Sequence, residues 1–355
     1  MAWPYSGMSR SYSYVRVDSS GKETQSLDDF VSSGTTITFD DLAQLKVSAS
    51  LQTIGTLDME RDFLRIYAHD TTGGTEEKTA LGTFLLSTPS VTHTSRREQE
   101  RTLTKGSAEG YSLLLVASQE TTEAPYFVAA GTGAVAHAKA ILEARGLRVS
   151  AEASSSALSA PAVFDAGTSW LAVANDLLAR AGFDTAEIDG YGGVLFSRYY
   201  DPASLAPTIT LEDGPECIFA DEVAHEFDLF EVPNKVVALS SGQDVTLIAT
   251  ATNTDPQNRY SIPSRGRTIT HVETVSQIES QAALEALARR VLQDKTSAVE
   301  SIRVRHPWFG PIIGKAARLV YERAELDFVG VAVSQTVTLD EAMSAETRFR
   351  RFVRM

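Results

Sequence analysis

Residues 167–182 read GTSWLAVANDLLARAG, and this stretch carries the clearest helix signal in the chain. Its apolar residues recur at the three- and four-residue spacing of one helical face: Trp170, Val173, Ala174, Leu177 and Leu178. Thr168 or Ser169 can cap the start of the helix, and Gly182 can end it. The stretch therefore predicts an amphipathic helix that packs its apolar face on a neighbouring element.

The residues around this helix indicate a small α+β unit. Residues 133–146 predict a second helix, which ends at Gly146. A turn at Asp189–Gly193 leads into an expected strand at Val194–Arg198. Helices packed on a small sheet make residues 125–205 an expected α+β domain.

Residues 1–124 have the pattern of an all-β unit. Short runs rich in β-branched and aromatic residues alternate with turn residues, and Asp70–Lys78 indicates an exposed hairpin tip. The expected strands lie at residues 11–17, 36–39, 46–51, 63–68, 83–87, 90–94 and 112–117. This spacing favours a barrel or a sandwich.

Residues 206–355 return to the β pattern, with an inserted loop and helix at about 253–297. Residues 253–267 are polar and contain two prolines, which predicts an extended loop, and residues 279–294 predict an amphipathic helix. The expected strands lie at 208–211, 235–240, 244–251, 268–272, 300–305, 317–322, 328–339 and 348–354. The fold class we expect is α+β and predominantly β, with domains at 1–124, 125–205 and 206–355.

The 355-residue chain has a formal net charge of −14, and its middle part carries nearly all of it. Between Arg148 and Asp255 there are 17 acidic and 4 basic residues. A surface with this balance repels nucleic acid and argues against a DNA-binding protein. Two interpretations stay open: an ordinary acidic, solvated surface, or an acidic wall along a path where nucleic acid slides without binding.

No segment predicts a membrane span, a secretion signal or a disulfide framework. The longest apolar runs, such as residues 113–116 and 331–333, are far below the roughly 20 residues that cross a bilayer. Residues 1–6 lack a basic region followed by an apolar core. Cys217 is the single cysteine and has no obvious activating base nearby, which predicts an inert thiol.

Titratable residues show no spacing that is typical of a catalytic or metal site. Six histidines are scattered along the chain: His69, His93, His137, His225, His271 and His306. His225 and Glu226 come nearest to a metal cluster, but successive residues of a strand face opposite sides. Acidic pairs such as Asp40-Asp41 could suggest a glycosidase, although chance pairs are expected in an acidic chain. We therefore predict no catalytic, cofactor-binding or metal-binding residue.

Arg265 and Arg267 are the two residues that the sequence singles out as a site. They flank Gly266 at the end of the polar loop. Two guanidinium groups placed in this way can bind carboxylates of a neighbouring subunit. The sequence therefore predicts a subunit interface at Arg265 and Arg267, with a plain solvated loop as the alternative.

Three ordered groups of residues resemble the baseplate or tail-tip hub family of tailed phages and related contractile particles. The first is the helix at 167–183, followed by the turn at 189–192 and the Tyr-Tyr-Asp-Pro stretch at 199–202. The second is FDLFEVPNKVV at 227–237, which is similar to the family's Val-Pro-Asn start of a strand. The third is IPSRGR at 262–267, the helix at 282–292 and a closing segment with Met343 and Arg348. The first 124 residues match the family only in β character.

The resemblance implies a homotrimer in which each chain supplies two tail-tube-like β-barrel domains, with the α+β domain between them. The ring would continue and close the tail tube, anchor the tape-measure protein and tip or fibre proteins beside the distal tail protein, and let genome DNA pass at ejection. It implies a virion protein of the tail tip, assembled in the host cytoplasm, with no cofactor. We expect no enzyme, because many relatives carry lytic activity in a C-terminal extension and this chain stops soon after the hub-like segment.

Two other functions stay open from the sequence. A tail-associated peptidoglycan hydrolase would give a lytic band in zymography that one carboxylate substitution abolishes. A receptor-binding tail-tip module could hold host sugars with Trp3, Tyr5, Tyr12 and Tyr14, although aromatic residues on alternating strands more often belong to a core. Binding of the isolated protein to cells would favour the receptor-binding function.

Overall fold

The computed structural model divides the chain into two compact units. The first unit comprises Met1–Tyr199, His306–Ile313 and Ser334–Glu346, and the second comprises Tyr200–Arg305, Gly314–Val333 and Thr347–Met355. The residues that the structure describes are 9–28, 30–54, 59, 61–72, 74–96, 101–200, 204–213, 223–227, 232–241, 246–275, 281–297, 300–340 and 343–351.

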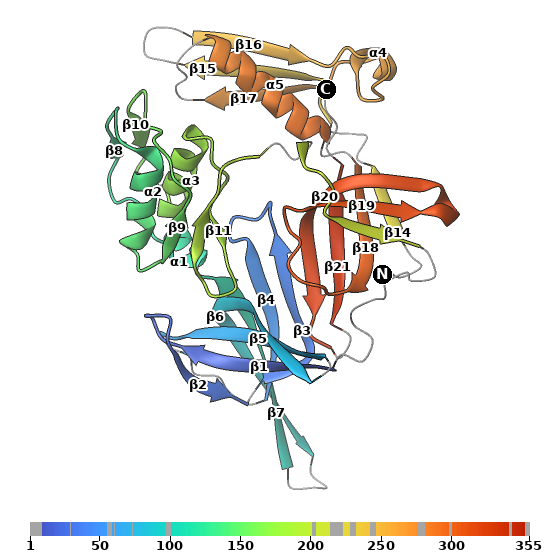
Figure 1. Ribbon diagram of the computed structural model, residues 1–355. Coiled ribbons are helices and arrows are strands. Elements are labelled where there is room, and N and C mark those ends of the chain that lie inside the picture. Colours follow the sequence, from blue (N-terminus) through green and yellow to red (C-terminus); the bar gives the residue numbers. More distant parts are fainter. Residues whose placement is uncertain are drawn as a thin grey trace. The chain divides into compact units, whose positions relative to one another are not determined.

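An antiparallel sheet forms the frame of the first unit (Figure 1), with strand order β20-β3-β4-β7-β6-β5-β1-β2. Its strands are β1 (Ser9–Val17), β2 (Glu23–Leu27), β3 (Phe30–Asp40), β4 (Val47–Ile54), β5 (Phe63–Thr72), β6 (Thr75–Arg96), β7 (Arg101–Ser112) and the last part of β20 (Leu326–Thr338). Side chains alternate between the two faces of each strand, so every second residue reaches the core. Ile37, Leu51, Ile66 and Phe84 are fully buried in that core.

Residues far along the chain complete the same core. Trp308, Val337, Leu339 and Met343 pack in the cluster that contains Ile66 and Phe84. The Tyr12 hydroxyl donates to the Asp340 carbonyl at 2.7 Å, and the Trp308 amide donates to the Met343 carbonyl at 2.8 Å. Tyr12 and Tyr14 thus pack in the core of the sheet and do not form an exposed sugar-binding surface. Trp3 and Tyr5 lie outside the described residues.

β6 and β7 form one long hairpin. The sequence predicted only two short strands in this region, at 83–87 and 90–94, and no strand at 101–111. The hairpin pairs residues from Phe84 opposite Ser112 to Arg96 opposite Arg101. The expected break near Ser87 and Ser90 is a shift of register within one continuous strand. The expected strand at 112–117 is wrong, because Leu114–Gln119 forms helix α1, with Leu114 and Ala117 buried on one face. A short apolar run does not distinguish a strand from a buried helix.

The α+β part of the first unit follows the sequence pattern closely. It contains α2 (Ala134–Glu143), α3 (Trp170–Arg180), the pair β8 (Tyr126–Val128) and β10 (Ala162–Phe164), and the sheet of β11 (Glu187–Ile188), β12 (Val194–Phe196) and β9 (Val149–Ala151). The Ser169 hydroxyl accepts from the Ala172 amide at 3.2 Å and caps α3. Gly146 and Gly182 end their helices with φ of +77° and +74°, as the sequence predicted.

The second unit contains two sheets. One has the order β14-β18-β21-β20-β19-β13, from β14 (Val223–Phe227), β18 (Glu300–Pro307), β21 (Ser344–Arg350), β20, β19 (Ala316–Tyr321) and β13 (Ile209–Glu212). The short 3-10 helix η2 (Glu322–Ala324) precedes β20. The other sheet has the order β16-β15-β17, from β15 (Lys235–Ser241), β16 (Thr246–Thr252) and β17 (Thr270–Val275), and α5 (Gln281–Ser297) packs on one of its faces.

The predicted fold class, α+β and predominantly β, is confirmed. The strand order of the described residues shows no closed barrel in either unit. The two-barrel organisation and the domain boundaries at residues 124 and 205 therefore stay predictions.

Candidate assembly interface

The polar loop of the second unit contains a short helix, not the fully extended chain expected from the sequence. Ile262–Arg265 forms α4, and the Ser261 hydroxyl caps it by accepting from the Ser264 amide at 3.3 Å. Gly266 ends the helix in the left-handed region with φ of +64°. The sequence signals for this helix are the capping residue Ser261, Pro263 in the first helical turn and Gly266 at the end. Proline is tolerated in the first turn because its missing N–H has no partner within the helix.

The two arginines of this loop have different surroundings. The Arg265 guanidinium donates through Nη1 to the Val232 carbonyl at 2.7 Å. The buried Asn234 side chain donates to the Arg267 carbonyl at 2.9 Å and accepts from the Ile269 amide at 2.8 Å. Arg265 thus anchors the loop within its own unit, whereas the Arg267 side chain is exposed. A contact of either arginine with another subunit stays a prediction.

A partly apolar face with a single charged residue lies beside this loop on the β16-β15-β17 sheet. α5 covers the opposite face with Leu284, Ala288 and Leu292. On the uncovered face, Ile248 is 57% exposed and Val272 is 54% exposed. The strand pairing places seven further residues on this face: Lys235, Val237, Leu239, Thr250, Thr252, Thr270 and Thr274. We name these nine residues the open sheet face; Lys235 is its one charged member, and no carboxylate belongs to it.

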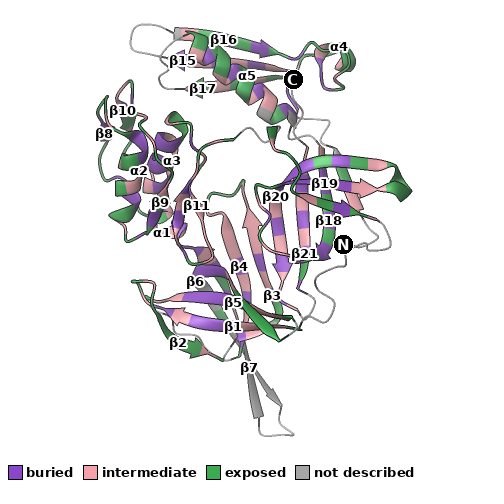
Figure 2. Ribbon diagram, in the orientation of Figure 1, coloured by how far each residue is buried: buried purple, intermediate pink, exposed green. Residues whose placement is uncertain are grey.

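A second apolar patch lies on the first unit. Phe127 and Val163 are directly opposite each other on β8 and β10, at 61% and 63% exposure, and this strand pair lies at the surface (Figure 2). Beneath it, the Tyr126 and Trp170 rings meet edge to face at 4.9 Å, and the Arg145 guanidinium lies 3.9 Å from the Trp170 ring centre. Neither apolar surface was predicted from the sequence.

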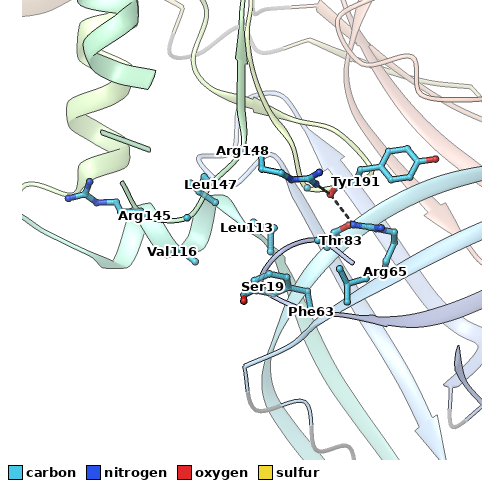
Figure 3. Close-up of a pocket in the computed structure, with 14 residues that line it drawn as sticks. Ser19, Phe63, Arg65, Thr83, Leu113, Val116, Arg145, Leu147, Arg148 and Tyr191 are labelled. Atoms are coloured by element: carbon cyan, nitrogen blue, oxygen red, sulfur yellow. Dashed lines mark hydrogen bonds between the residues drawn. The ribbon is translucent and has the colours of Figure 1, made fainter. Parts of the chain in front are cut away.

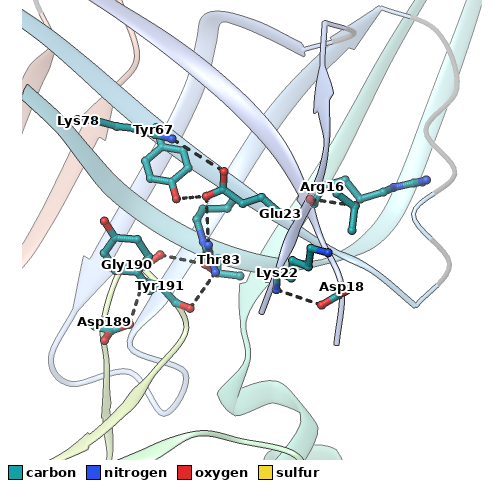
Figure 4. A network of polar contacts seen from close by, with 12 residues as sticks. Arg16, Asp18, Lys22, Glu23, Tyr67, Lys78, Thr83, Asp189, Gly190 and Tyr191 are labelled. Atoms are coloured by element: carbon teal, nitrogen blue, oxygen red, sulfur yellow. Dashed lines mark hydrogen bonds and ion pairs between the residues drawn. The ribbon is translucent and has the colours of Figure 1, made fainter. Parts of the chain in front are cut away.

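A polar network connects the first sheet with the turn at Asp189–Gly193 (Figure 4). Arg65, only 4% exposed, donates to the Thr83 hydroxyl at 2.9 Å and to the Tyr191 carbonyl at 3.1 Å. The Tyr67 hydroxyl donates to Glu23, and Arg65 lies 3.5 Å from the same carboxylate. These interactions lower the pKa of Glu23, the Tyr67 hydrogen bond most of all.

A small cavity of about 50 Å³ adjoins this network (Figure 3). Arg65, Arg145 and Arg148 line it together with Tyr191, and the Arg148 guanidinium donates to the Tyr191 carbonyl at 2.7 Å. The volume suits a few water molecules and not a nucleotide or a sugar. We therefore assign the network a structural role in holding the turn to the sheet.

The histidines do not converge on one another. His137 contacts Tyr126 at 2.8 Å, His271 contacts Glu273 at 2.9 Å, and burial lowers the pKa of His306. His225 and Glu226 bind different partners, Glu300 at 2.9 Å and Arg303 at 2.8 Å. Within the described residues no group of three or more histidine, cysteine or acidic side chains could hold a metal ion. The His93 side chain and Cys217 lie outside that part of the structure.

No described helix combines the length and the apolar character that a membrane crossing requires.

Comparison with solved structures shows which proteins share this architecture. A tail protein from Neisseria meningitidis matches with a TM-score of 0.69 at 15% identity, covering 96% of each chain. The 43 kDa tail protein of prophage MuSo2 from Shewanella oneidensis matches with a TM-score of 0.65 at 12% identity, covering 96% of this chain and 98% of that one. The chain has the phage tail-protein fold. The sequence resemblance is thereby confirmed in its fold.

The tail-protein fold also occurs outside phages. The Escherichia coli protein c3393, a component of the type VI secretion system, matches with a TM-score of 0.53 at 11% identity, covering 93% of this chain and 75% of that one. That protein is described as structurally similar to the T4 tail proteins gp27 and gp5. No protein-family model matches the sequence, and no curated protein does.

Proposed function

We propose that the chain is a structural subunit of a phage tail tip: a homotrimeric baseplate or tail-tip hub that continues and closes the tail tube. The observation that carries this proposal is the tail-protein fold, which extends over 96% of this chain and of its Neisseria counterpart. The hub would anchor the tape-measure protein and the tip or fibre proteins, contact the distal tail protein, and let genome DNA pass. It would be assembled in the host cytoplasm and remain at the tail tip of the virion.

The surfaces of the subunit support an assembly role. Exposed apolar residues that gather on one sheet face are typical of an interaction surface. The open sheet face has this character around Ile248 and Val272, and its single charge allows close packing without burying a carboxylate. A closed ring of identical copies would cover such a face on every subunit.

The charge of the chain supports passage of DNA without binding. The excess of acidic residues between Arg148 and Asp255 would repel phosphate groups wherever those residues line the lumen. A tail-tip hub needs this property because retained DNA would block ejection.

Native mass spectrometry of the full chain tests the oligomeric state. Three copies of the 38.4 kDa chain give a mass of about 115 kDa. A 115 kDa species that persists on dilution supports the hub, while a chain that stays at 38.4 kDa at high concentration contradicts it. Electron microscopy of tails labelled with an antibody against the chain then tests the location. We expect the label at the tail tip, and label along the tube would contradict the proposed location.

A matched pair of variants tests the open sheet face. Val272→Glu places a carboxylate on that face, and Ala286→Glu places the same charge on the exposed side of α5. We expect Val272→Glu to lower the trimer fraction at least tenfold and Ala286→Glu to leave it unchanged. Equal trimer fractions in the two variants would exclude the open sheet face from the interface.

A further inference from the structure

Ser13, His69 and Glu76 form a continuous hydrogen-bonded series on the first unit. Ser13 Oγ lies 2.7 Å from His69 Nε2, and His69 Nδ1 lies 2.5 Å from Glu76 Oε1. The serine and the histidine are 56 positions apart in the sequence, and the histidine and the glutamate are 7 apart. No compact sequence motif contains these three residues, so the sequence alone does not reveal a nucleophile–base set.

Strand register explains why the three side chains meet. β1, β5 and β6 are neighbouring antiparallel strands, in which Ser13 pairs with Tyr67 and His69 pairs with Lys78. Residues two apart on a strand share a face, as do directly opposed residues on neighbouring strands. Ser13, Tyr67, His69, Glu76 and Lys78 therefore lie on one face, opposite to the core face that holds Ile66 and Ala68.

The order of the groups is that of an activated serine nucleophile. With the proton of neutral His69 on Nδ1, that nitrogen donates to Glu76, and Nε2 is free to accept the Ser13 proton. A base hydrogen-bonded to a hydroxyl and itself oriented by a carboxylate is the recurring arrangement of serine hydrolases on unrelated folds. Glu76 is exposed and Ser13 and His69 are half-buried, so solvent and a small substrate reach the series.

A positive charge lies on the same face. The Lys78 ammonium is 3.8 Å from the centre of the Tyr67 ring, and Tyr67 is the cross-strand neighbour of Ser13. Lys78 also lies 4.0 Å from Glu23 (Figure 4). Lys78 and Arg65, which is two residues from Tyr67 on β5, are therefore cations on this face that could stabilise negative charge forming near Ser13.

We propose that Ser13, His69 and Glu76 are the catalytic groups of a carboxylic-ester hydrolase, an activity beyond the hub role. Ser13 Oγ attacks the ester carbonyl while His69 Nε2 takes the hydroxyl proton; the alkoxide leaves with that proton as an alcohol, and the acyl group stays on Ser13. Water then attacks the acyl-serine, with His69 as base, to release the carboxylic acid and restore Ser13. Because Ser13 and His69 are half-buried on a sheet face and Glu76 is exposed, the substrates we propose are small esters, such as acetyl groups on sugar hydroxyls.

Covalent labelling of the full chain tests this proposal. An alkyl fluorophosphonate reacts with an activated serine by forming a Ser–phosphorus bond and expelling fluoride, and peptide mass spectrometry identifies the labelled residue. We expect the label on Ser13. The rate of labelling should fall at least about tenfold in His69→Gln, because general-base assistance contributes about 10²–10⁴-fold to rate. Ser26→Ala, an exposed strand serine outside the series, is the matched control and should be labelled like the unchanged chain.

Ester turnover provides the second readout. Hydrolysis of p-nitrophenyl acetate should fall at least about tenfold in Ser13→Ala and in His69→Gln, and it should be unchanged in Ser26→Ala. Circular dichroism checks that each variant is folded. Unlabelled Ser13, or equal turnover in Ser13→Ala and the unchanged chain, would overturn the proposal and leave the series as a purely structural contact. Native mass spectrometry of the same samples reports the hub role separately.

Discussion

Gly190 lies so close to the backbone of Ala80 that a β-carbon at Gly190 would be 2.1 Å from the Ala80 carbonyl oxygen. The Gly190 carbonyl also accepts from the Thr83 hydroxyl at 2.9 Å. Both contacts join the turn at Asp189–Gly193 to strand β6, so this turn fixes the α+β part of the first unit on its sheet. Only glycine allows two backbone segments to approach this closely.

Gly190→Ala should destabilise the first unit. The added methyl group meets a backbone atom, which cannot rotate away, so either the turn or β6 must shift. We expect a loss of about 1–3 kcal/mol in the free energy of unfolding, measured by urea denaturation. Gly133→Ala is the control, because the nearest atom to its β-carbon would be 3.8 Å away. A loss in Gly190→Ala no larger than in Gly133→Ala would show that the turn is not fixed by this contact.

Arg65→Met should also destabilise the first unit. The change removes the hydrogen bonds to the Thr83 hydroxyl and the Tyr191 carbonyl and the ion pair with the partly exposed Glu23. We expect a loss of about 1–3 kcal/mol, because the remaining polar groups are left with fewer partners. Arg318→Met breaks a shorter pair, at 2.6 Å, between the exposed side chains of Arg318 and Asp327, and it should cost much less. Similar losses in the two variants would contradict the structural role of the buried network.

The carboxyl group of Glu187 should make stability depend on pH. Burial raises its pKa above the ordinary value of 4.5, and the nearby Asp41 raises it further. Between the ordinary and the raised pKa the folded state binds more protons than the unfolded state, so stability falls as pH rises through that window. Glu187→Gln removes this penalty, so its melting temperature should exceed that of the unchanged chain at pH 7 and converge with it near pH 4. A variant that melts lower at pH 7 would show that the carboxylate is stabilising.

Local signals in the sequence were reliable where short-range chemistry decides the structure. Ser169 and Gly182 set the ends of α3 because a cap and a left-handed residue act within one turn. The run at Leu114–Gln119 was misassigned because burial on a neighbouring element, not its composition, selected the helix. The entry of Trp308 into the first core and the meeting of Ser13 with His69 depend on strand pairing between distant segments. A single sequence does not specify that pairing.

The loop at Ser264–Arg267 yields a sharper interface test than its sequence alone could provide. Arg265 holds the Val232 carbonyl within its own unit, so Arg265→Ala should lower the stability of the second unit by about 1 kcal/mol, whatever its effect on assembly. Arg267 contributes its backbone carbonyl to the Asn234 side chain, and that contact survives truncation of the arginine side chain. Arg267→Ala should keep that backbone contact and reduce the trimer fraction in native mass spectrometry, because the exposed arginine side chain is placed to reach a neighbouring subunit. An unchanged trimer fraction in Arg267→Ala would exclude this side chain from the subunit interface, and an altered urea midpoint would show that it supports the loop instead.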